Sequence, residues 1–161
     1  MRTRVIGFII LGLLGLILSE CSSADRDDAG VITESGDVSA FEIQVGDCFV
    51  DLPGNGEDGN TFSSIEAIPC NEGHKWQMFS SQTLTLPEYS EEGARSQADD
   101  MCNQAVQNLI NGMSSIKLDA FQNAQLTYTL PTSKSWTVKG DRTIDCFIGS
   151  DTETYFTSVF N

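Results

Sequence analysis

Cysteine is the residue type whose number and spacing carry the most chemistry in this chain. Five are present: Cys21, Cys48, Cys70, Cys102 and Cys146. A cysteine can act as a nucleophile, a zinc ligand, a lipid attachment site or half of a disulfide. No two of them form a Cys-x-x-Cys pair and the sequence has one histidine, which disfavours zinc. Without Cys21 the remaining four form an even set, as disulfides require.

The first twenty residues have the pattern of an export signal. Two arginines precede the unbroken apolar run Val5–Leu18, which is shorter than the roughly 18 residues of a transmembrane helix. The Leu-Ser-Glu-Cys sequence that ends at Cys21 resembles a bacterial lipobox, although Glu20 replaces the usual small residue. We expect a lipoprotein-type signal peptide over residues 1–20 and a lipid on Cys21. An uncleaved signal anchor is the alternative, and both place the rest of the chain outside the membrane.

The four remaining cysteines allow three connectivities, and export to an oxidising compartment permits disulfides. Cys48 and Cys70 lie at expected strand ends on either side of a long loop. Cys102 lies in the apolar stripe of an expected helix, and Cys146 on the inward face of an expected strand. We therefore prefer the pairs Cys48 with Cys70 and Cys102 with Cys146.

Composition and charge limit the function classes. With 161 residues and a net charge of −14, the chain has room for one folded domain whose surface repels phosphates, so nucleic acid is not an expected partner. The charge favours solubility outside the cell, or else a cationic partner or metal ions. Residues 21–40 read as a disordered acidic linker and residues 41–161 as the domain.

The periodicity of the domain predicts an α+β fold, an antiparallel sheet covered by one main helix. Ser90 can cap that helix and Asn111–Gly112 can end it. The segment from Trp136 to Cys146 is predicted to be a β-hairpin that turns at Gly140-Asp141. Further strands are expected at 41–50, 65–68, 78–86, 126–130 and 155–160.

A search for catalytic patterns disfavours an enzyme. His74 is the single histidine, and neither a Gly-x-Ser-x-Gly elbow nor a phosphate-binding glycine loop is present. Two acids that hydrolyse a glycan are an alternative that sequence leaves open. The acidic loop Asp51–Asn60 does not have EF-hand spacing, because Pro53 and Phe62 occupy its third and twelfth positions. It leaves a non-standard cation site as another alternative, and no cofactor is expected.

Five residues are candidates for binding. His74 and Trp76 follow Cys70 in what reads as an exposed connection, while Trp76 in the core and His74 hydrogen-bonded within a loop are the structural alternatives. Trp136, Asp141 and Arg142 belong to the predicted hairpin. We expect an ion pair between Asp141 and Arg142 that fixes the turn, with a ligand contact as the alternative.

Several of these motifs together resemble the septum formation domain family of actinobacterial exported proteins and lipoproteins. The resemblance runs from about Phe41 to the C-terminus and rests on Val45-Gly46-Asp47-Cys48-Phe49, on Ile68-Pro69-Cys70 with His74, on a helical Cys102, and above all on Trp136-x-x-x-Gly140-Asp141-Arg142-x-x-x-Cys146. Gln77 departs from the family, which usually has an acid there. The resemblance implies an envelope protein associated with division septa and without an established catalytic activity.

The sequence thus predicts a lipid-anchored module on the extracytoplasmic face of the cell membrane. It would bind an envelope protein or a cell-wall component without catalysing a reaction. An envelope hydrolase and a ligand-binding or metal-binding lipoprotein are the two alternatives.

Overall fold

A computed structural model describes residues 23–52 and 63–160, and its fold is α+β. A six-stranded sheet has the order β3-β5-β4-β6-β8-β7, and all five neighbouring pairs are antiparallel. A separate two-stranded ribbon pairs β1 with β2. The predicted fold class, an antiparallel sheet with one main helix and two disulfides, is confirmed.

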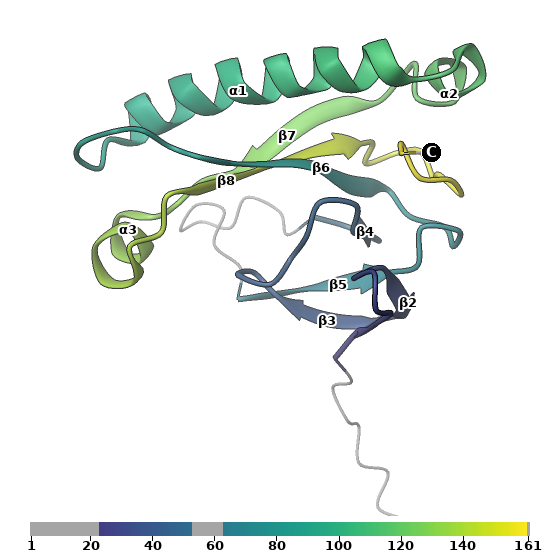
Figure 1. The fold of residues 1–161 in the computed structure, drawn as a ribbon, viewed down its shortest axis with the longest axis horizontal. Coiled ribbons are helices and arrows are strands. Elements are labelled where there is room, and N and C mark those ends of the chain that lie inside the picture. The colour runs from purple at the N-terminus through teal and green to yellow at the C-terminus, as the bar shows by residue number, and fades with distance from the viewer. Residues whose placement is uncertain (1–22, 53–62, 161) are drawn as a thin grey trace, which may run out of the picture.

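The bounds of the elements show where each segment of the chain lies in this architecture (Figure 1). The three helices are α1 (Glu91–Gly112), α2 (Ser115–Ala120) and α3 (Ser133–Lys139). The strands are β1 (Asp25–Arg26), β2 (Ile32–Glu34), β3 (Gly36–Ser39), β4 (Cys48–Phe49), β5 (Ser64–Ile68), β6 (Trp76–Thr83), β7 (Gln125–Thr129) and β8 (Thr143–Gly149). None of the helices in the described part of the chain is long and apolar enough to cross a bilayer.

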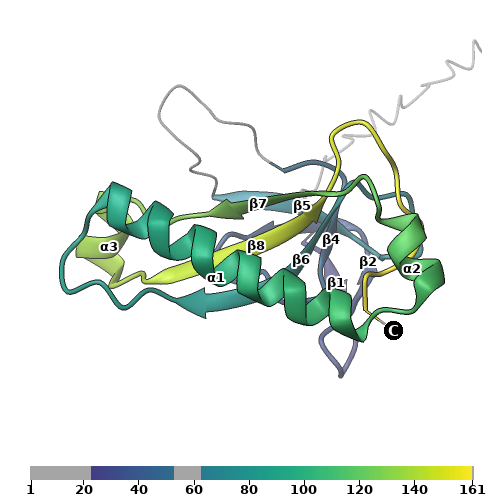
Figure 2. The same ribbon diagram turned by 90° about the horizontal axis from the view of Figure 1, so that it is seen from above.

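Helix α1 forms as its sequence predicts. The Ser90 side chain accepts a hydrogen bond from the Gly93 amide at 3.2 Å, and two glutamates follow in the first turn. The buried positions recur every four residues, which places them on one face; they are Ala94, Ala98, Cys102 and Val106. This face lies on β6, β7 and β8, which α1 crosses diagonally (Figure 2).

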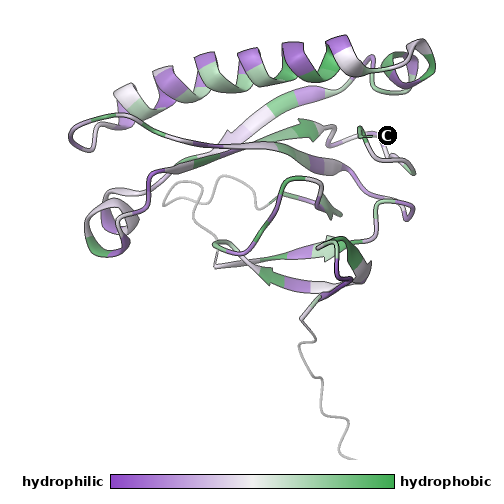
Figure 3. Cartoon of the chain, in the orientation of Figure 1, coloured by the Kyte–Doolittle hydropathy of each residue, from purple (hydrophilic) through white to green (hydrophobic). Residues whose placement is uncertain are grey.

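The central strands separate two hydrophobic cores (Figures 1 and 3). On β8, Ile144, Cys146 and Ile148 face α1 and join the first core, while Phe147 faces away and joins the second. The second core lies between this far face and the β2, β3, β4 and β5 part of the structure. Because side chains alternate along a strand, Asp145 points to the same side as Phe147.

Both preferred disulfides are present. Cys48 bonds Cys70 with a Cα–Cα distance of 5.3 Å, and Cys102 bonds Cys146 at 5.7 Å. The first joins β4 to the end of β5, and the second joins α1 to β8 through the first core. The two disulfides therefore cross-link one pair of neighbouring segments in the sheet and one helix-to-sheet contact.

The predicted hairpin from Trp136 to Cys146 is wrong in its first half. Residues 133–139 form helix α3, with a capping box between Thr132 and Ser135 and with Gly140 in the left-handed conformation at its end (φ 68°). A single apolar alternation, Trp136 and Val138, fits a strand and a short helix equally well, so the Thr132 cap decides the outcome. The second half is confirmed as β8.

The expectation of a disordered linker over residues 21–40 is wrong for residues 25–39, which contain β1, β2 and β3. Ile32 and Val38 are buried in the second core although polar residues surround them in sequence. The strand expected over 41–50 is reduced to β4, with Gly46 at a turn (φ 107°). The strand expected over 155–160 is only a bridge between His74 and Tyr155. The expected signal peptide and Cys21 lie outside the described residues.

Candidate functional site

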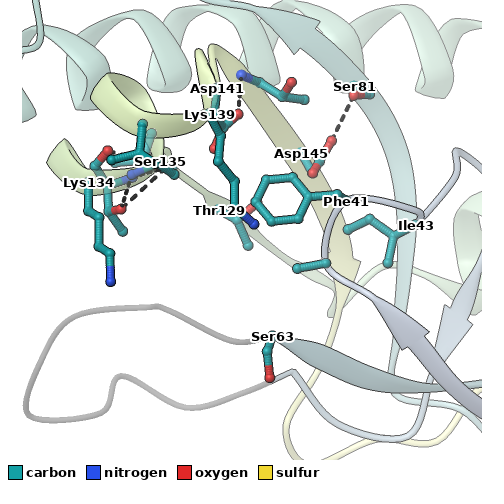
Figure 4. A pocket seen from close by; sticks show the side chains of 15 residues that line it. Phe41, Ile43, Ser63, Ser81, Thr129, Lys134, Ser135, Lys139, Asp141 and Asp145 are labelled. Carbon is teal, nitrogen blue, oxygen red and sulfur yellow. Dashed lines mark hydrogen bonds between the residues drawn. The ribbon is translucent and has the colours of Figure 1, made fainter.

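A groove of about 820 Å³ opens on the side of the central strands that faces away from α1 (Figure 4). Its floor comes from β6, β7 and β8, one wall from α3, and the opposite wall from the segment after β3. The lining mixes hydroxyls, apolar groups and charges of both signs. Such a combination of shape and convergent polar groups is typical of a ligand-binding site.

Asp145 provides the charge on the floor of this groove. It pairs with Ser81 across β8 and β6, and the Ser81 hydroxyl donates a hydrogen bond of 2.7 Å to Oδ1 (Figure 4). The residue is only 8% exposed. Burial raises the pKa of the Asp145 carboxyl above its usual value; the Ser81 hydrogen bond opposes this shift and the nearby Asp141 charge adds to it. The floor is therefore a carboxylate that is costly to keep ionised.

Asp47, a second buried carboxylate, differs from Asp145 because a positive charge and several donors neutralise it. Arg26 grips it with two hydrogen bonds of 2.6 Å, one to each oxygen, and the Gln44 amide donates a third. Within residues 23–52 and 63–160, no lysine or arginine forms such an ion pair with Asp145. Asp47 is thus a structural acid that fastens β1 to the domain, whereas Asp145 faces a groove.

Helix α3, the first wall, is held in place by the residues of the Trp-x-x-x-Gly-Asp-Arg motif. Trp136 is buried in the first core against Tyr89, and the Arg142 guanidinium stacks on its ring at 3.4 Å from the centroid. Arg142 also donates to the carbonyl oxygens of Trp136 and Asp141. Gly140 ends the helix. The motif therefore positions the groove wall, and neither Trp136 nor Arg142 lines the groove itself.

The expected ion pair between Asp141 and Arg142 is wrong. The Asp141 carboxylate accepts instead from the Thr143 amide at 3.0 Å, which starts β8, while Arg142 binds backbone oxygens. Asp141 does line the groove. It is thus the one predicted candidate residue that the structure brings to this site.

The rim of the groove carries two lysines and an aromatic ring. The Lys139 ammonium lies 4.1 Å from the centroid of Phe41, a ring that is 58% exposed. Lys134 extends from the first turn of α3 and is exposed (Figure 4). The groove is therefore acidic at its floor and basic at its mouth.

His74 and Trp76, the leading candidates for an exposed site, are not exposed. Both are buried, Trp76 within the second core. His74 Nδ1 lies 3.1 Å from the Glu72 carbonyl oxygen, while His74 Nε2 and Trp76 Nε1 have no hydrogen-bond partner among the described residues. Burial lowers the pKa of His74, which the Glu72 contact opposes. The structural alternatives therefore fit both residues, because Trp76 packs in a core and His74 contacts the nearby Glu72 carbonyl oxygen.

Gln77, where the resembled family usually has an acid, is also internal. Its amide nitrogen donates to the Gly46 carbonyl oxygen and to Ser158, and its Oε1 accepts from the Val159 amide at 2.7 Å. A carboxylate could accept from Val159 and Ser158 but could not donate to Gly46. Gln77 here attaches the C-terminal segment to β6.

No group of three or more metal-ligating side chains occurs within residues 23–52 and 63–160. Asp51, at the start of the acidic loop, forms an ion pair with Lys75 at 2.7 Å. The remainder of the proposed calcium loop, 53–60, lies outside the described residues.

Sequence reasoning missed the floor of the groove. Asp145 lies between Ile144 and Cys146, so the alternation that correctly pointed those two inward also pointed Asp145 outward. From sequence alone, an acidic side chain on the outward face of a strand is expected to be exposed to solvent. What sequence cannot show is that α3 and the segment around Phe41 cover that face, which turns an outward residue into a buried one.

Comparison with known proteins found no matching family, no similar curated protein and no similar solved structure. The resemblance to the septum formation domain family stays a prediction carried by the motif residues.

Proposed function

We propose that this chain is a lipid-anchored binding module on the extracytoplasmic face of a cell membrane. It holds a polar ligand of the cell envelope in the groove between α3 and the segment around Phe41. The observation that carries the proposal is the groove itself, with a buried carboxylate on its floor and charged side chains at its mouth. Uncompensated buried charge is costly and is concentrated at functional sites in proteins.

The two disulfides support the extracytoplasmic placement. Each joins elements that are distant in sequence, with separations of 22 and 44 residues, and the second lies inside a core. Disulfides of this structural type persist in oxidising compartments and are rare in the cytosol. The signal-like leader and the cysteine pattern point to the same compartment.

The fold changes what a lipid on Cys21 would do. Ser23 already forms a bridge with Asp37, and Arg26 is fixed to Asp47. Two residue steps separate Cys21 from Ser23, and an extended chain covers about 7 Å in that distance. An acylated Cys21 would therefore hold the domain at the membrane surface, and not at the end of the twenty-residue tether expected from composition.

Fractionation of cells tests the anchor. The wild-type chain is expected in the membrane fraction, and the Cys21→Ala variant in the soluble extracytoplasmic fraction or retained as a precursor. Ser22→Ala, the matched control next to it, should fractionate as the wild type does. A Cys21→Ala chain that distributes and migrates as the wild type does would rule out lipidation.

The association with division septa rests on the family resemblance alone. A fluorescent fusion at the C-terminus should concentrate at the division site of dividing cells. Uniform distribution of the fusion, together with normal septa in a deletion strain, would contradict it without affecting the groove.

A glycan hydrolase is the second candidate, favoured by one observation. Asp141 and Asp145 line the same groove, and the Asp141 charge contributes to the raised pKa of Asp145. Two carboxyl groups in one groove are the machinery of glycoside hydrolysis. Incubation of the wild type with purified cell walls would release soluble glycan fragments, and Asp145→Asn would abolish the release; no release by the wild type excludes this candidate.

A further inference from the structure

We infer that the groove takes a ligand with a protonated primary amine at one end and a carboxylate at the other, the amine lying against Asp145. This inference rests on the proposed function, because it names the class of ligand for the same site. Short peptides and amino acids whose amine and carboxylate are separated by several carbons belong to this class.

The floor of the groove argues for the amine. Ser81 donates to one oxygen of Asp145, and the described residues offer no donor to the other. Asp141 lines the same groove, so a second negative charge lies nearby. A protonated amine carries three donors and one positive charge. It would satisfy the second carboxylate oxygen and remove the cost of burying the charge.

The mouth of the groove argues for the carboxylate. Lys134 and Lys139 both extend from α3 into the lining, so a ligand that is only cationic meets like charges on entry. Lys139 is partly oriented by its contact with the Phe41 ring. A ligand carboxylate placed between these two ammonium groups is attracted to them, whereas a simple amine is repelled.

Apolar side chains connect the two ends. Phe41, Ile43 and Val138 line the groove, and Phe41 and Val138 are largely exposed. A short methylene chain between the amine and the carboxylate would cover part of this apolar surface. The probe that matches all three regions is 6-aminohexanoate.

The test is a titration of the full-length, disulfide-bonded protein in detergent micelles, followed by amide chemical shifts in NMR spectra. Four probes of similar length separate the contributions: 6-aminohexanoate, hexylamine, hexanoate and 1-hexanol. We expect 6-aminohexanoate to shift the amides of residues 129, 143 and 145 and to bind most tightly. Hexylamine should bind more weakly, and hexanoate and hexanol should leave these amides unchanged.

Asp145→Asn is the decisive variant because it keeps the shape of the side chain and removes its charge. This variant should bind 6-aminohexanoate with an affinity lower by about tenfold or more. Asp151→Asn removes the same charge from an exposed site away from the groove lining and should leave the affinity unchanged.

Two results would overturn the inference. The first leaves the groove as a binding site, and the second does not. If hexanoate or hexanol shifts the same amides and Asp145→Asn binds as the wild type does, the groove is a binding site but the amine is not its ligand group. If no probe shifts these amides, both the ligand class and the assignment of binding to this groove fail.

Discussion

The Arg142 guanidinium lies 3.4 Å from the centroid of the Trp136 ring, and this stack fastens α3 to the start of β8. Both residues come from the motif that carries the family resemblance. Trp136 is buried against the first core, and Arg142 closes the loop between helix and strand through two backbone oxygens. The most specific part of the sequence therefore builds one wall of the groove.

Replacing Arg142 should destabilise the domain. Arg142→Ala loses a cation–π contact and two hydrogen bonds, for which we expect a loss of about 1 to 2 kcal/mol in the free energy of unfolding. Urea denaturation measures it. Arg95→Ala, which removes an exposed ion pair with Glu91 on α1, is the control and should change stability by less than about 0.5 kcal/mol. Equal effects of the two substitutions would show that the stack contributes nothing.

Removing each disulfide should cost stability in proportion to the loop that it closes. Separations of 22 and 44 residues correspond to roughly 3 and 4 kcal/mol in the chain-entropy description. Cys102→Ala with Cys146→Ala should therefore lower the urea midpoint more than Cys48→Ala with Cys70→Ala. The first pair is also more deeply buried, which adds a packing loss in the same direction. The reverse order would contradict the assignment of Cys102–Cys146 as the internal cross-link.

The ionised Asp145 carboxylate should lower the stability of the protein at neutral pH, compared with a neutral side chain at this position. Its pKa is raised in the folded state, so the folded state binds the proton more tightly than the unfolded state does. Stability is thus lost as the pH rises through the folded pKa, and the loss is complete above it. Asp145→Asn should raise the melting temperature at pH 7 and weaken ligand binding. A melting temperature that falls in this variant would mean that the ionised carboxylate stabilises the fold.

His74 should act in the opposite direction. Its pKa is lowered by burial, so the unfolded state takes up the proton first, and stability falls as the pH drops below the ordinary value of about 6.5. Between pH 7.5 and 5.5 the loss can reach about 1.4 kcal/mol. His74 is the single histidine. Measuring it in a protein that also carries Asp145→Asn removes the opposing pH dependence of the Asp145 carboxyl.

The matched variant is His74→Asn, which retains a donor toward the Glu72 carbonyl oxygen and cannot take up a proton in this range. Its free energy of unfolding, measured in urea at each pH, should stay level where the wild-type value falls. Parallel curves for the two proteins would assign the pH dependence to another group.

Patterns that span several turns predicted their elements well, and short ones did not. The four-residue spacing in α1 and the alternation through Ile144, Cys146 and Ile148 correctly placed both halves of one disulfide on facing surfaces. The single pair Trp136 and Val138 could not separate a strand from a helix of seven residues. Burial of Ile32 and Val38 in an acidic segment depends on partners that are distant in sequence, such as Ile65, which pairs with Val38.

The candidate site shows the same limit. Its carboxylate was invisible in the sequence, because the cover over Asp145 is made by Phe41 and α3, which lie far from each other along the chain. Of the two leading exposed-site candidates, Trp76 is buried because β6 begins earlier than expected, and His74 is buried where it bridges Tyr155. The sequence around a histidine and a tryptophan near a cysteine does not reveal whether these side chains are buried.

Mass spectrometry of the intact chain, recovered from cells without reduction, reports the lipid anchor and the disulfides in one measurement. We expect a chain that begins at Cys21 with a diacylglyceryl group, has no free thiol, and yields peptides linked Cys48 to Cys70 and Cys102 to Cys146. A chain recovered from the cytosol with an unmodified Cys21 and free thiols at the other four positions would contradict it.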